Sequence, residues 1–503
     1  MTDAAAFIDV GTNSIHMIVV DFSGGMPGTT VFQDKETLRM GRGLYETGEL
    51  DKATLGRIEV VLNKFCQIAK EYGAEDIIAM ATCAAREAPN ALELLNIATG
   101  CGIDLRVIPG KEEARLIRLG VLGIHCARRT LCIDIGGGST ELALADGEEN
   151  LYLDSLSLGA VRMAYGSGID QKGKVTAKQY DSLKRMVDEQ SYRSVDILKA
   201  YGFDEVVGSS GTVEALADAC AARRGDGDGS YLLLSELKVL MKDMCGLTAA
   251  QRGLLPKVSP GRAEIVIGGG VVVEELMEAL GIERMVISRS GLREGMKMDY
   301  MMSRGYTDKS LRESSVKTLA ARYGCDGNHG RAVERYTRML YSEFTRINLI
   351  SKGPQEELLV YAARLLDVGT FINYDRHNIH SYEIIRNSYL AGFDSSEQEF
   401  MALLARFHHG SFPKEESKFF CGFTRRHIIT LRKYALLLRF ADILDRCRDN
   451  AVEEVTAEIL NGNVNFTIVS SEDMTLSLWK LRTMAKDFED VFGYRIHIDL
   501  LRV

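Results

Sequence analysis

The sequence predicts an α/β fold with two similar lobes, followed by a helical region and a small α+β segment. Three observations predict it. A glycine-rich strand-turn-strand stretch occurs twice, helices alternate with strands around both copies, and beyond residue 310 glycine and proline become scarce while helix-forming residues dominate. We place the lobes at residues 1–125 and 126–305, the helical region at 306–450 and the α+β segment at 451–503.

The first copy to consider is LCIDIGGGSTELAL, residues 131–144. An apolar run, typical of a buried strand, leads into a polar turn that contains Asp134, Gly136, Gly137, Gly138, Ser139 and Glu141. Consecutive glycines are kept where the chain must turn tightly or where a ligand approaches the main chain, and their amides can point together at an anion. The stretch therefore predicts a phosphate cradle, with a glycine-bulged hairpin as the alternative.

The acidic residues of this turn indicate a metal ion. Carboxylates alone repel phosphate, so Asp134 and Glu141 favour phosphate binding only with a cation between them and the anion. Mg²⁺ prefers oxygen ligands and is commonly shared with substrate phosphates. We therefore predict a Mg²⁺ site, which Mn²⁺ could also fill.

The second copy is FIDVGTNSIHMIVVDF, residues 7–22, in which Asp9 precedes Asp134 by 125 residues. Setting Asp9 over Asp134 also aligns Gly11 with Gly136, Asn13 with Gly138, Ser14 with Ser139, and His16 with Glu141. An internal repeat of this kind predicts two related lobes with a ligand held between their loops.

Further candidate residues lie between and after the two copies. Residues 51–72 have helical spacing, residues 77–81 and 104–108 indicate strands, and the helix after Pro109 carries Glu112 and Glu113 in its first turn, where acids commonly only complement the helix dipole. Two more glycine turns are predicted to follow strands, at 206–216 and 265–276. The first of these turns places Ser210, Gly211 and Thr212 at a helix start, an anion site by geometry.

Bulk composition excludes several classes of protein. The net charge of −9 provides no global basic field for nucleic acid or anionic membranes, and no apolar run approaches the length of a membrane span. The ten cysteines show no disulfide or zinc spacing. We expect a cytoplasmic protein in a reducing compartment.

Eight motifs, in order, resemble the exopolyphosphatase/guanosine pentaphosphate phosphohydrolase (Ppx/GppA) family. They are IDVGTNSIHM, TCAAREA, GKEEARLI, IDIGGGSTEL, SLGAVRM, GSSGT, GRAEIVIGGG and SRSGLREGM, and they span roughly residues 5 to 300. The resemblance implies two actin-like lobes of the sugar kinase/Hsp70/actin superfamily. The helical tail resembles that of the long members, whose third domain is similar to HD-type phosphohydrolases, and this implies a homodimer.

The resemblance also implies roles for matching residues. Glu113 corresponds to the general base that activates water, and Asp134 and Glu141 correspond to the acidic Mg²⁺ site. Arg86 and Arg262 correspond to arginines that bind phosphate, and Ser139 corresponds to a phosphate or water contact in the central loop. Asn13 and Ser14 join the phosphate-binding set by the repeat alignment. Glu112 is the neighbour with which Glu113 could be confused.

The helical region departs from an active HD site. The His-Asp position reads Leu366–Asp367, and no histidine lies between His329 and His377. Remnants of a metal shell are Asp367, His380, His408, His409 and Asp442. Because two imidazoles are missing, we expect a degenerate, structural domain.

Four arginines of this region recur every seven residues: Arg425, Arg432, Arg439 and Arg446. On one helix they would form a slowly drifting stripe, about 10.5 Å between neighbours. Such a stripe could guide a chain of phosphates. The alternative is a solvated helix face with partners for Asp442 and Asp445.

These observations predict an exopolyphosphatase that releases the terminal phosphate of inorganic polyphosphate with Mg²⁺. The alternatives are hydrolysis of guanosine pentaphosphate (pppGpp) to tetraphosphate, phosphate transfer between ATP or polyphosphate and an acceptor, and a non-catalytic sensor. Substrate preference, chain-length preference and any need for a monovalent cation do not follow from the sequence.

Overall fold

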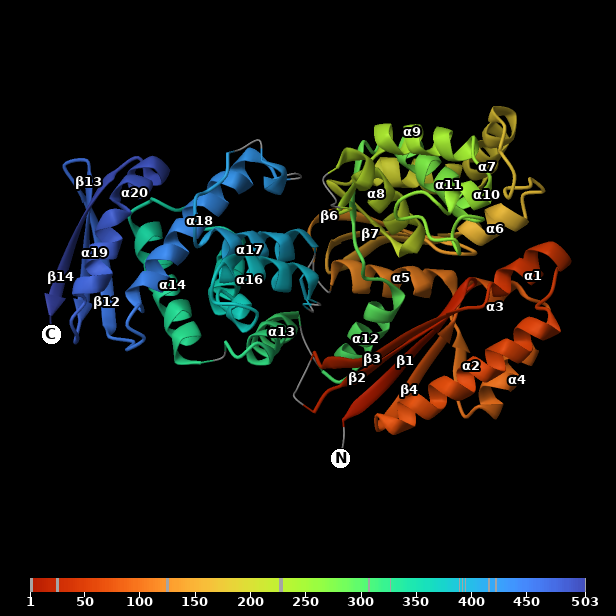
Figure 1. Ribbon diagram of the computed structural model, residues 1–503, viewed down its shortest axis with the longest axis horizontal. Helices are drawn as coiled ribbons and strands as arrows, with labels where there is room; N and C mark the ends of the chain where they lie inside the picture. The colour runs from red at the N-terminus through yellow and green to blue at the C-terminus, as the bar shows by residue number, and fades with distance from the viewer. Residues whose placement is uncertain are drawn as a thin grey trace. The chain divides into compact units, whose positions relative to one another are not determined.

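The computed structural model describes residues 3–23, 27–123, 126–225, 229–305, 308–325, 327–388, 390, 392–393, 395–414, 417–420 and 423–502. The chain divides near residue 308 into two compact units. The first unit holds both lobes, and the second holds the helical region together with the C-terminal strands (Figure 1).

Lobe I is built on a five-stranded sheet in which β1 is central. The order is β3 (Thr29–Thr37), β2 (Ser14–Asp21), β1 (Ala4–Val10), β4 (Ala74–Ala81) and β5 (Leu105–Val107). Strands β1, β2 and β3 are antiparallel neighbours, whereas β4 and β5 continue the sheet in parallel. The apolar run of β1 is buried on both faces, as expected of a central strand.

Lobe II repeats this arrangement. Its order is β8 (Glu149–Leu156), β7 (Thr140–Gly147), β6 (Cys126–Ile135), β9 (Glu205–Ser209), β11 (Arg284–Ile287) and β10 (Tyr231–Leu233). Again three antiparallel strands come first, and β9 and β11 then extend the sheet in parallel. The predicted α/β class is confirmed, and the second lobe adds one antiparallel edge strand.

Helices cover both sheets. Lobe I carries α1 (Met40–Thr47), α2 (Lys52–Glu71), α3 (Cys83–Glu87), α4 (Ala91–Gly100) and, from the end of the unit, α12 (Leu292–Ser303). Lobe II carries α5 (Gly110–Leu122), α6 (Ala160–Tyr165), α7 (Ala177–Tyr201), α8 (Ser210–Arg224), α9 (Leu234–Cys245), α10 (Ala249–Arg252) and α11 (Val266–Leu280). The predicted helix at 51–72 is α2, and it begins where Asp51 accepts the amide of Thr54 at 2.8 Å.

The expectation of a strand and glycine turn at 265–276 is wrong. These residues form α11, and Gly268, Gly269 and Gly270 lie inside the helix. A Cβ on Gly268 would lie 2.8 Å from the Ala160 carbonyl oxygen, and one on Gly269 would lie 2.4 Å from Thr212 Cγ2. The three glycines therefore serve close packing of a buried helix rather than a turn.

The chain passes from lobe I to lobe II through α5 and packs again on lobe I through α12. Tyr300 of α12 contacts Phe7 of β1 edge to face and donates a hydrogen bond to Asp76. Helices α5 and α12 cross at Gly295 of α12. A Cβ on this glycine would lie 1.8 Å from the carbonyl oxygen of Leu116 in α5. Backbone therefore touches backbone at this crossing.

The second unit combines helices and a sheet around one core. Its helices are α13 (Asp308–Arg322), α14 (Asn328–Arg346), α15 (Gln355–Arg364), α16 (His377–Asn387), α17 (Ser395–Phe407), α18 (Arg425–Leu444), α19 (Thr475–Thr483) and α20 (Ala485–Phe492), with short 3₁₀ turns η1 (Val368–Phe371) and η2 (Lys418–Phe420). Its strands β12 (Val452–Leu460), β13 (Asn463–Ser470) and β14 (Arg495–Arg502) form one sheet. Phe344 and Phe440 of the helices contact Phe466 of β13, which joins the two parts.

Among the helices that the structure describes, none is both long enough and apolar enough to cross a bilayer.

The glycine crossing generates a stability prediction. Replacing Gly295 by alanine forces its Cβ against the Leu116 carbonyl, so we expect the free energy of unfolding of the first unit to fall by about 1–3 kcal/mol. Gly56→Ala is the matched control, because Gly56 lies in α2 with open space around it, and there alanine should stabilise by up to about 1 kcal/mol. Urea unfolding followed by circular dichroism measures both. Equal stability of the two variants would contradict the crossing.

Candidate active site

The two glycine loops have the same local geometry. The Gly11 amide donates to the Ser14 carbonyl at 3.1 Å, and the Gly136 amide donates to the Ser139 carbonyl at 3.0 Å. In the flanking strands Asp9 pairs with His16, and Asp134 pairs with Glu141. These aligned residues therefore occupy equivalent positions in the two hairpins, as the internal repeat predicts.

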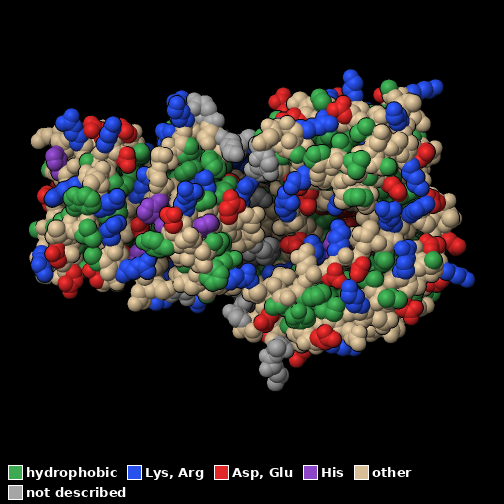
Figure 2. Space-filling model, viewed as in Figure 1, with side chains coloured by type: hydrophobic (Ala, Val, Ile, Leu, Met, Phe, Trp, Pro, Cys, Tyr) green, Lys and Arg blue, Asp and Glu red, His purple; other side chains and the backbone are tan. Residues whose placement is uncertain are grey.

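The loops also touch each other. A Cβ on Gly137 would lie 3.1 Å from Thr12 Cβ, and one on Gly138 would lie 2.7 Å from Thr12 Oγ1. A side chain would crowd the contact at Gly137 and would displace neighbouring side chains at Gly138. The predicted loop residues Asn13 and Ser14 therefore lie beside the Gly136–Ser139 turn. Figure 2 shows acidic and basic side chains together around the recess between the lobes of this unit.

Helix α6 fixes the central loop. The amides of Ala160 and Val161 donate to the carbonyls of Gly136 and Gly137 at 3.0 and 2.8 Å. Arg162 Nε donates to the Gly138 carbonyl at 2.7 Å, while Nη2 of the same guanidinium binds Glu87 at 2.5 Å. The predicted motif SLGAVRM thus supplies the support of the loop, and Arg162 is a positioning residue.

Three predicted acids are buried at this place. Glu113, Asp134 and Glu141 are 6 %, 7 % and 2 % exposed. Asp134 accepts the Ser209 hydroxyl at 2.5 Å, and Glu141 accepts the Ser155 hydroxyl at 2.8 Å. The hydroxyls orient the carboxylates, but they supply too few hydrogen bonds to compensate two buried charges.

Burial and neighbouring carboxylates also raise the pKa values of the acids at this place. Burial raises the pKa of Asp134 to about 7, and neighbouring Glu113 adds to the rise. Burial, with repulsion from Glu113 and Asp134, raises the pKa of Glu141 well above its ordinary value. Asp9, at the equivalent position of lobe I, also has its pKa raised to about 7 by burial and by Asp134, against the lowering effect of Arg293. Four acids therefore share one electrostatic site.

A hard divalent cation fits this set of donors. All four side chains offer carboxylate oxygens, which Mg²⁺ prefers, and each would regain its charge next to a cation. Asp134 and Glu141 are the residues that would hold it, as the sequence predicts. When bound, such an ion neutralises charge that develops on phosphate oxygens.

Glu113 and Arg86 form an ion pair. Arg86 Nη1 donates to Glu113 Oε2 at 2.6 Å and to the Ile108 carbonyl at 3.0 Å. Burial raises the pKa of Glu113 to about 7 although Arg86 lowers it, and Asp9 raises it further. The predicted base and a predicted phosphate ligand are thus neighbours, with Glu113 in the first turn of α5.

The turn between β9 and α8 forms another part of the site. Ser210 has a left-handed φ of 76°, a conformation that a non-glycine residue rarely adopts and that is concentrated at functional sites. A Cβ on Gly211 would lie 1.8 Å from an Arg262 guanidinium nitrogen, so Arg262 lies directly on this turn. Thr212 is buried in the first turn of α8. The predicted residues Ser210–Thr212 and Arg262 are therefore brought together.

Two basic residues of the site, Arg293 and Lys35, were not predicted from the sequence. Arg293, in the first turn of α12, acts electrostatically on Asp9 and His16, and its buried Nη1 has no hydrogen-bond partner among the described residues. Partial burial lowers the pKa of Lys35 in β3, and Arg262 and Arg293 lower it further. Arg293 lies in the motif SRSGLREGM, which could have indicated it, whereas Lys35 lies in no motif.

Three arginines of the predicted stripe, Arg425, Arg432 and Arg439, lie in α18 (Arg425–Leu444), and the fourth does not. Arg446 lies beyond the end of α18 at Leu444. Arg432 donates to the Pro413 carbonyl at 3.1 Å, and Arg439 donates to the carbonyls of Phe407 and Gly410 at 2.8 and 2.5 Å. These two side chains therefore anchor the segment after α17, and only Arg425 and Arg446 are exposed.

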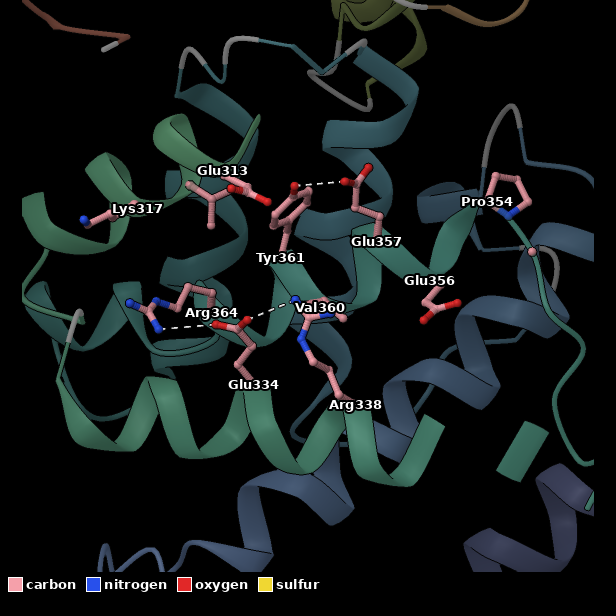
Figure 3. A pocket seen from close by; sticks show the side chains of 12 residues that line it. Glu313, Lys317, Glu334, Arg338, Pro354, Glu356, Glu357, Val360, Tyr361 and Arg364 are labelled. Atoms are coloured by element: carbon pink, nitrogen blue, oxygen red, sulfur yellow. Dashed lines mark hydrogen bonds and ion pairs between the residues drawn. The ribbon is translucent and has the colours of Figure 1, made fainter. Parts of the chain in front are cut away.

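A pocket of about 550 Å³ lies in the second unit, and none of the predicted phosphate-binding residues lines it. Figure 3 shows two interactions of Glu334, which binds Arg338 at 3.1 Å and Arg364 at 3.3 Å, and the hydrogen bond that Tyr361 donates to Glu357 at 3.0 Å. Both arginines among the labelled lining residues are thus paired with an acid of the same pocket.

The profile of the Ppx/GppA phosphatase family matches residues 18–304, and that of Ppx/GppA phosphatase domain III matches residues 311–486. The chain belongs to the Ppx/GppA phosphatase family. The family membership predicted from the sequence is confirmed. We refer to the helical part below as domain III.

Curated relatives match over most of their length. A guanosine-5'-triphosphate,3'-diphosphate pyrophosphatase of Photobacterium profundum is 29 % identical over 86 % of both chains. One of Vibrio atlanticus is 26 % identical over 99 % of this chain and 98 % of its own.

Solved structures match about three fifths of the chain. An exopolyphosphatase of Cytophaga hutchinsonii has a TM-score of 0.55 at 24 % identity and covers 61 % of this chain and 99 % of its own. A Ppx/GppA family member of Aquifex aeolicus has a TM-score of 0.51 at 22 % identity and covers 61 % of this chain and all of its own. Both likenesses show a common fold.

The buried acids generate a prediction about pH. A carboxyl whose pKa is raised on folding stabilises the fold below its unfolded pKa and loses that contribution as pH rises through the folded value. Without divalent cations, we therefore expect the thermal midpoint of the first unit to fall by a few degrees between about pH 4 and 7.5. Added Mg²⁺ should restore it at pH 7.5.

Asp134→Asn separates this effect from general pH sensitivity. The amide carries no charge, so the variant should lose much of the fall with pH and much of the response to Mg²⁺. Differential scanning calorimetry with chelator and with Mg²⁺ measures both. An unchanged response to Mg²⁺ in Asp134→Asn would contradict the assignment of Asp134 as a metal ligand.

Proposed function

We propose that this chain is a Mg²⁺-dependent phosphohydrolase that removes the terminal 5'-phosphate of guanosine 5'-triphosphate 3'-diphosphate. One observation carries the reaction class: three buried carboxylates and Arg86 converge where two glycine loops touch. Hydrolysis of a phosphoanhydride needs an oriented water molecule and neutralised phosphate oxygens, and little covalent chemistry, because its transition state is loose.

Each part of the site has a task in this reaction. Glu113 orients the attacking water and accepts its proton, and a pKa near 7 suits a base that works at neutral pH. Arg86, Arg262 and the glycine loops bind the phosphate oxygens through planar guanidinium and main-chain N–H groups. Arg162 keeps the central loop in place through its bond to the Gly138 carbonyl.

The choice of substrate rests on the relatives. Those named for guanosine-5'-triphosphate,3'-diphosphate cover both units of the chain, whereas the exopolyphosphatase structure covers 61 % of it. This supports the guanosine substrate over inorganic polyphosphate, which was the main expectation from sequence. Polyphosphate stays the second candidate, because its terminal phosphoanhydride presents the same reacting group.

Parallel assays distinguish these substrates. Phosphate release is measured with Mg²⁺ from guanosine 5'-triphosphate 3'-diphosphate, from long polyphosphate and from tripolyphosphate. We expect the highest kcat/KM for the guanosine nucleotide. Adding ADP as an acceptor should leave phosphate release unchanged, whereas formation of ATP would indicate phosphate transfer. A higher kcat/KM for long polyphosphate would reverse the order of the two candidates.

Glu113→Gln tests the base. Glutamine keeps the shape of the side chain but cannot accept a proton, so we expect a fold close to wild type and a loss in kcat of about 10²- to 10⁴-fold. Glu112→Gln is the matched control, because Glu112 lies in the same helical turn and pairs with Arg115 at 2.7 Å. It should retain nearly full activity. Wild-type turnover in Glu113→Gln would overturn the assignment.

A further inference from the structure

Four histidines from three separate segments of the chain lie close together in domain III. His329 lies in α14, His377 begins α16, and His408 and His409 directly follow α17. His377, His408 and His409 can each offer a ring nitrogen, and the three nitrogens lie within 4.8 Å of one another. The expectation that this domain has too few imidazoles is therefore wrong, although His380, which was among the predicted remnants, is not one of the three.

Hydrogen bonds fix which nitrogens carry protons. His377 Nδ1 bonds the Tyr374 carbonyl at 3.1 Å, and His408 Nδ1 bonds the Ala405 carbonyl at 2.5 Å. A carbonyl oxygen can only accept, so each Nδ1 is a donor and each neutral ring has its lone pair on Nε2. The two Nε2 atoms face each other at 3.1 Å. Two lone pairs at this distance need a positive species between or beside them, either an extra proton or a metal ion.

The spacing fits a metal ion. Two imidazole nitrogens bound to one ion at about 2.0–2.1 Å, with an angle between about 90° and 110°, lie about 2.9–3.4 Å apart. The observed Nε2–Nε2 distance falls within this range. Tying Nδ1 to a carbonyl is also the usual way in which a protein orients an imidazole ligand.

Carboxylates complete the cluster. Asp367 Oδ1 lies 3.5 Å from His377 Nε2, and Asp442 Oδ2 lies 3.8 Å from His409 Nε2. Both acids also flank His329 Nε2, at 3.6 and 3.4 Å.

His329 is held in turn from its other side. Its Nδ1 lies 2.6 Å from the buried carboxylate of Asp445, which also accepts the Asn450 amide at 2.9 Å. This chain of bonds fixes the ring from behind, as outer partners of metal ligands commonly do.

The surrounding structure fixes the cluster in place yet leaves it accessible. His408 is only 2 % exposed, and the Arg439 bonds to the Phe407 and Gly410 carbonyls hold the segment that carries His408 and His409. The side chain of His409 is 50 % exposed, so an ion can enter from solvent.

From this geometry we infer that His377, His408 and His409, with Asp367 and Asp442, bind one divalent transition-metal ion of the Zn²⁺ or Fe²⁺ type. Mg²⁺ is not the expected occupant, because imidazole nitrogens suit the later transition metals whereas Mg²⁺ prefers oxygen. The site is independent of the carboxylate site of the first unit and of the proposed reaction.

The test uses the full chain, freed of metal with a chelator. To keep zinc out of the first unit, it carries Asp134→Asn. Isothermal titration with ZnCl₂, in the presence of excess Mg²⁺, should show one Zn²⁺ per chain. His377→Ala and His409→Gln should each weaken that binding about 10- to 100-fold. His497→Gln, at an exposed position of β14, should leave it unchanged.

Three outcomes would overturn the inference. They are absence of tight Zn²⁺ binding before any histidine is replaced, unchanged binding in both His377→Ala and His409→Gln, and displacement of the Zn²⁺ by millimolar Mg²⁺. His409→Gln alters a half-exposed side chain, so a misfolded His377→Ala would not remove the test. Loading with Co²⁺ adds a readout besides affinity, because the visible absorption of nitrogen-bound Co²⁺ should weaken in each variant.

Discussion

The first unit depends on one constraint: two glycine loops touch, and carboxylates are buried directly behind them. The contact leaves little room for a side chain at Gly137 or Gly138, because Thr12 lies close to where a Cβ would be. It brings Asp9 and Asp134, the last acids of two equivalent strands, close enough for Asp134 to raise the pKa of Asp9. The duplicated sheets, α6 and the Arg162 bonds all serve to hold these loops in register.

Much of this arrangement could be predicted from the sequence. Aligning Asp9 with Asp134 in the sequence also aligned His16 with Glu141, and the structure places these residues at equivalent positions. Asp9 lies opposite His16, and Asp134 lies opposite Glu141, because the turn sets the register of each hairpin. The motifs also indicated Glu113 and Arg86, which form an ion pair, and Arg262, which lies on the turn at Gly211. The two lobes share their topology: each begins with this hairpin, and parallel strands then extend the sheet.

Other parts depended on information that a single sequence does not carry. Residues 265–276 combine an apolar run with three glycines, a pattern typical of a strand and turn, yet they form a helix because neighbouring helices approach too closely for side chains. Lys35 reaches the site through sheet order, which no local motif reports. In domain III the histidines are separated by up to 80 residues, so only tertiary structure reveals that they meet.

The crossing of α5 and α12 has a mechanical consequence. These helices are where the chain leaves lobe I and where it returns to it, and at Gly120 and Gly295 their backbones are in direct contact. Because no side chain stands between the two backbones, sliding or separating α5 and α12 would break this contact. The crossing therefore ties the segment where the chain leaves lobe I to the segment where it returns.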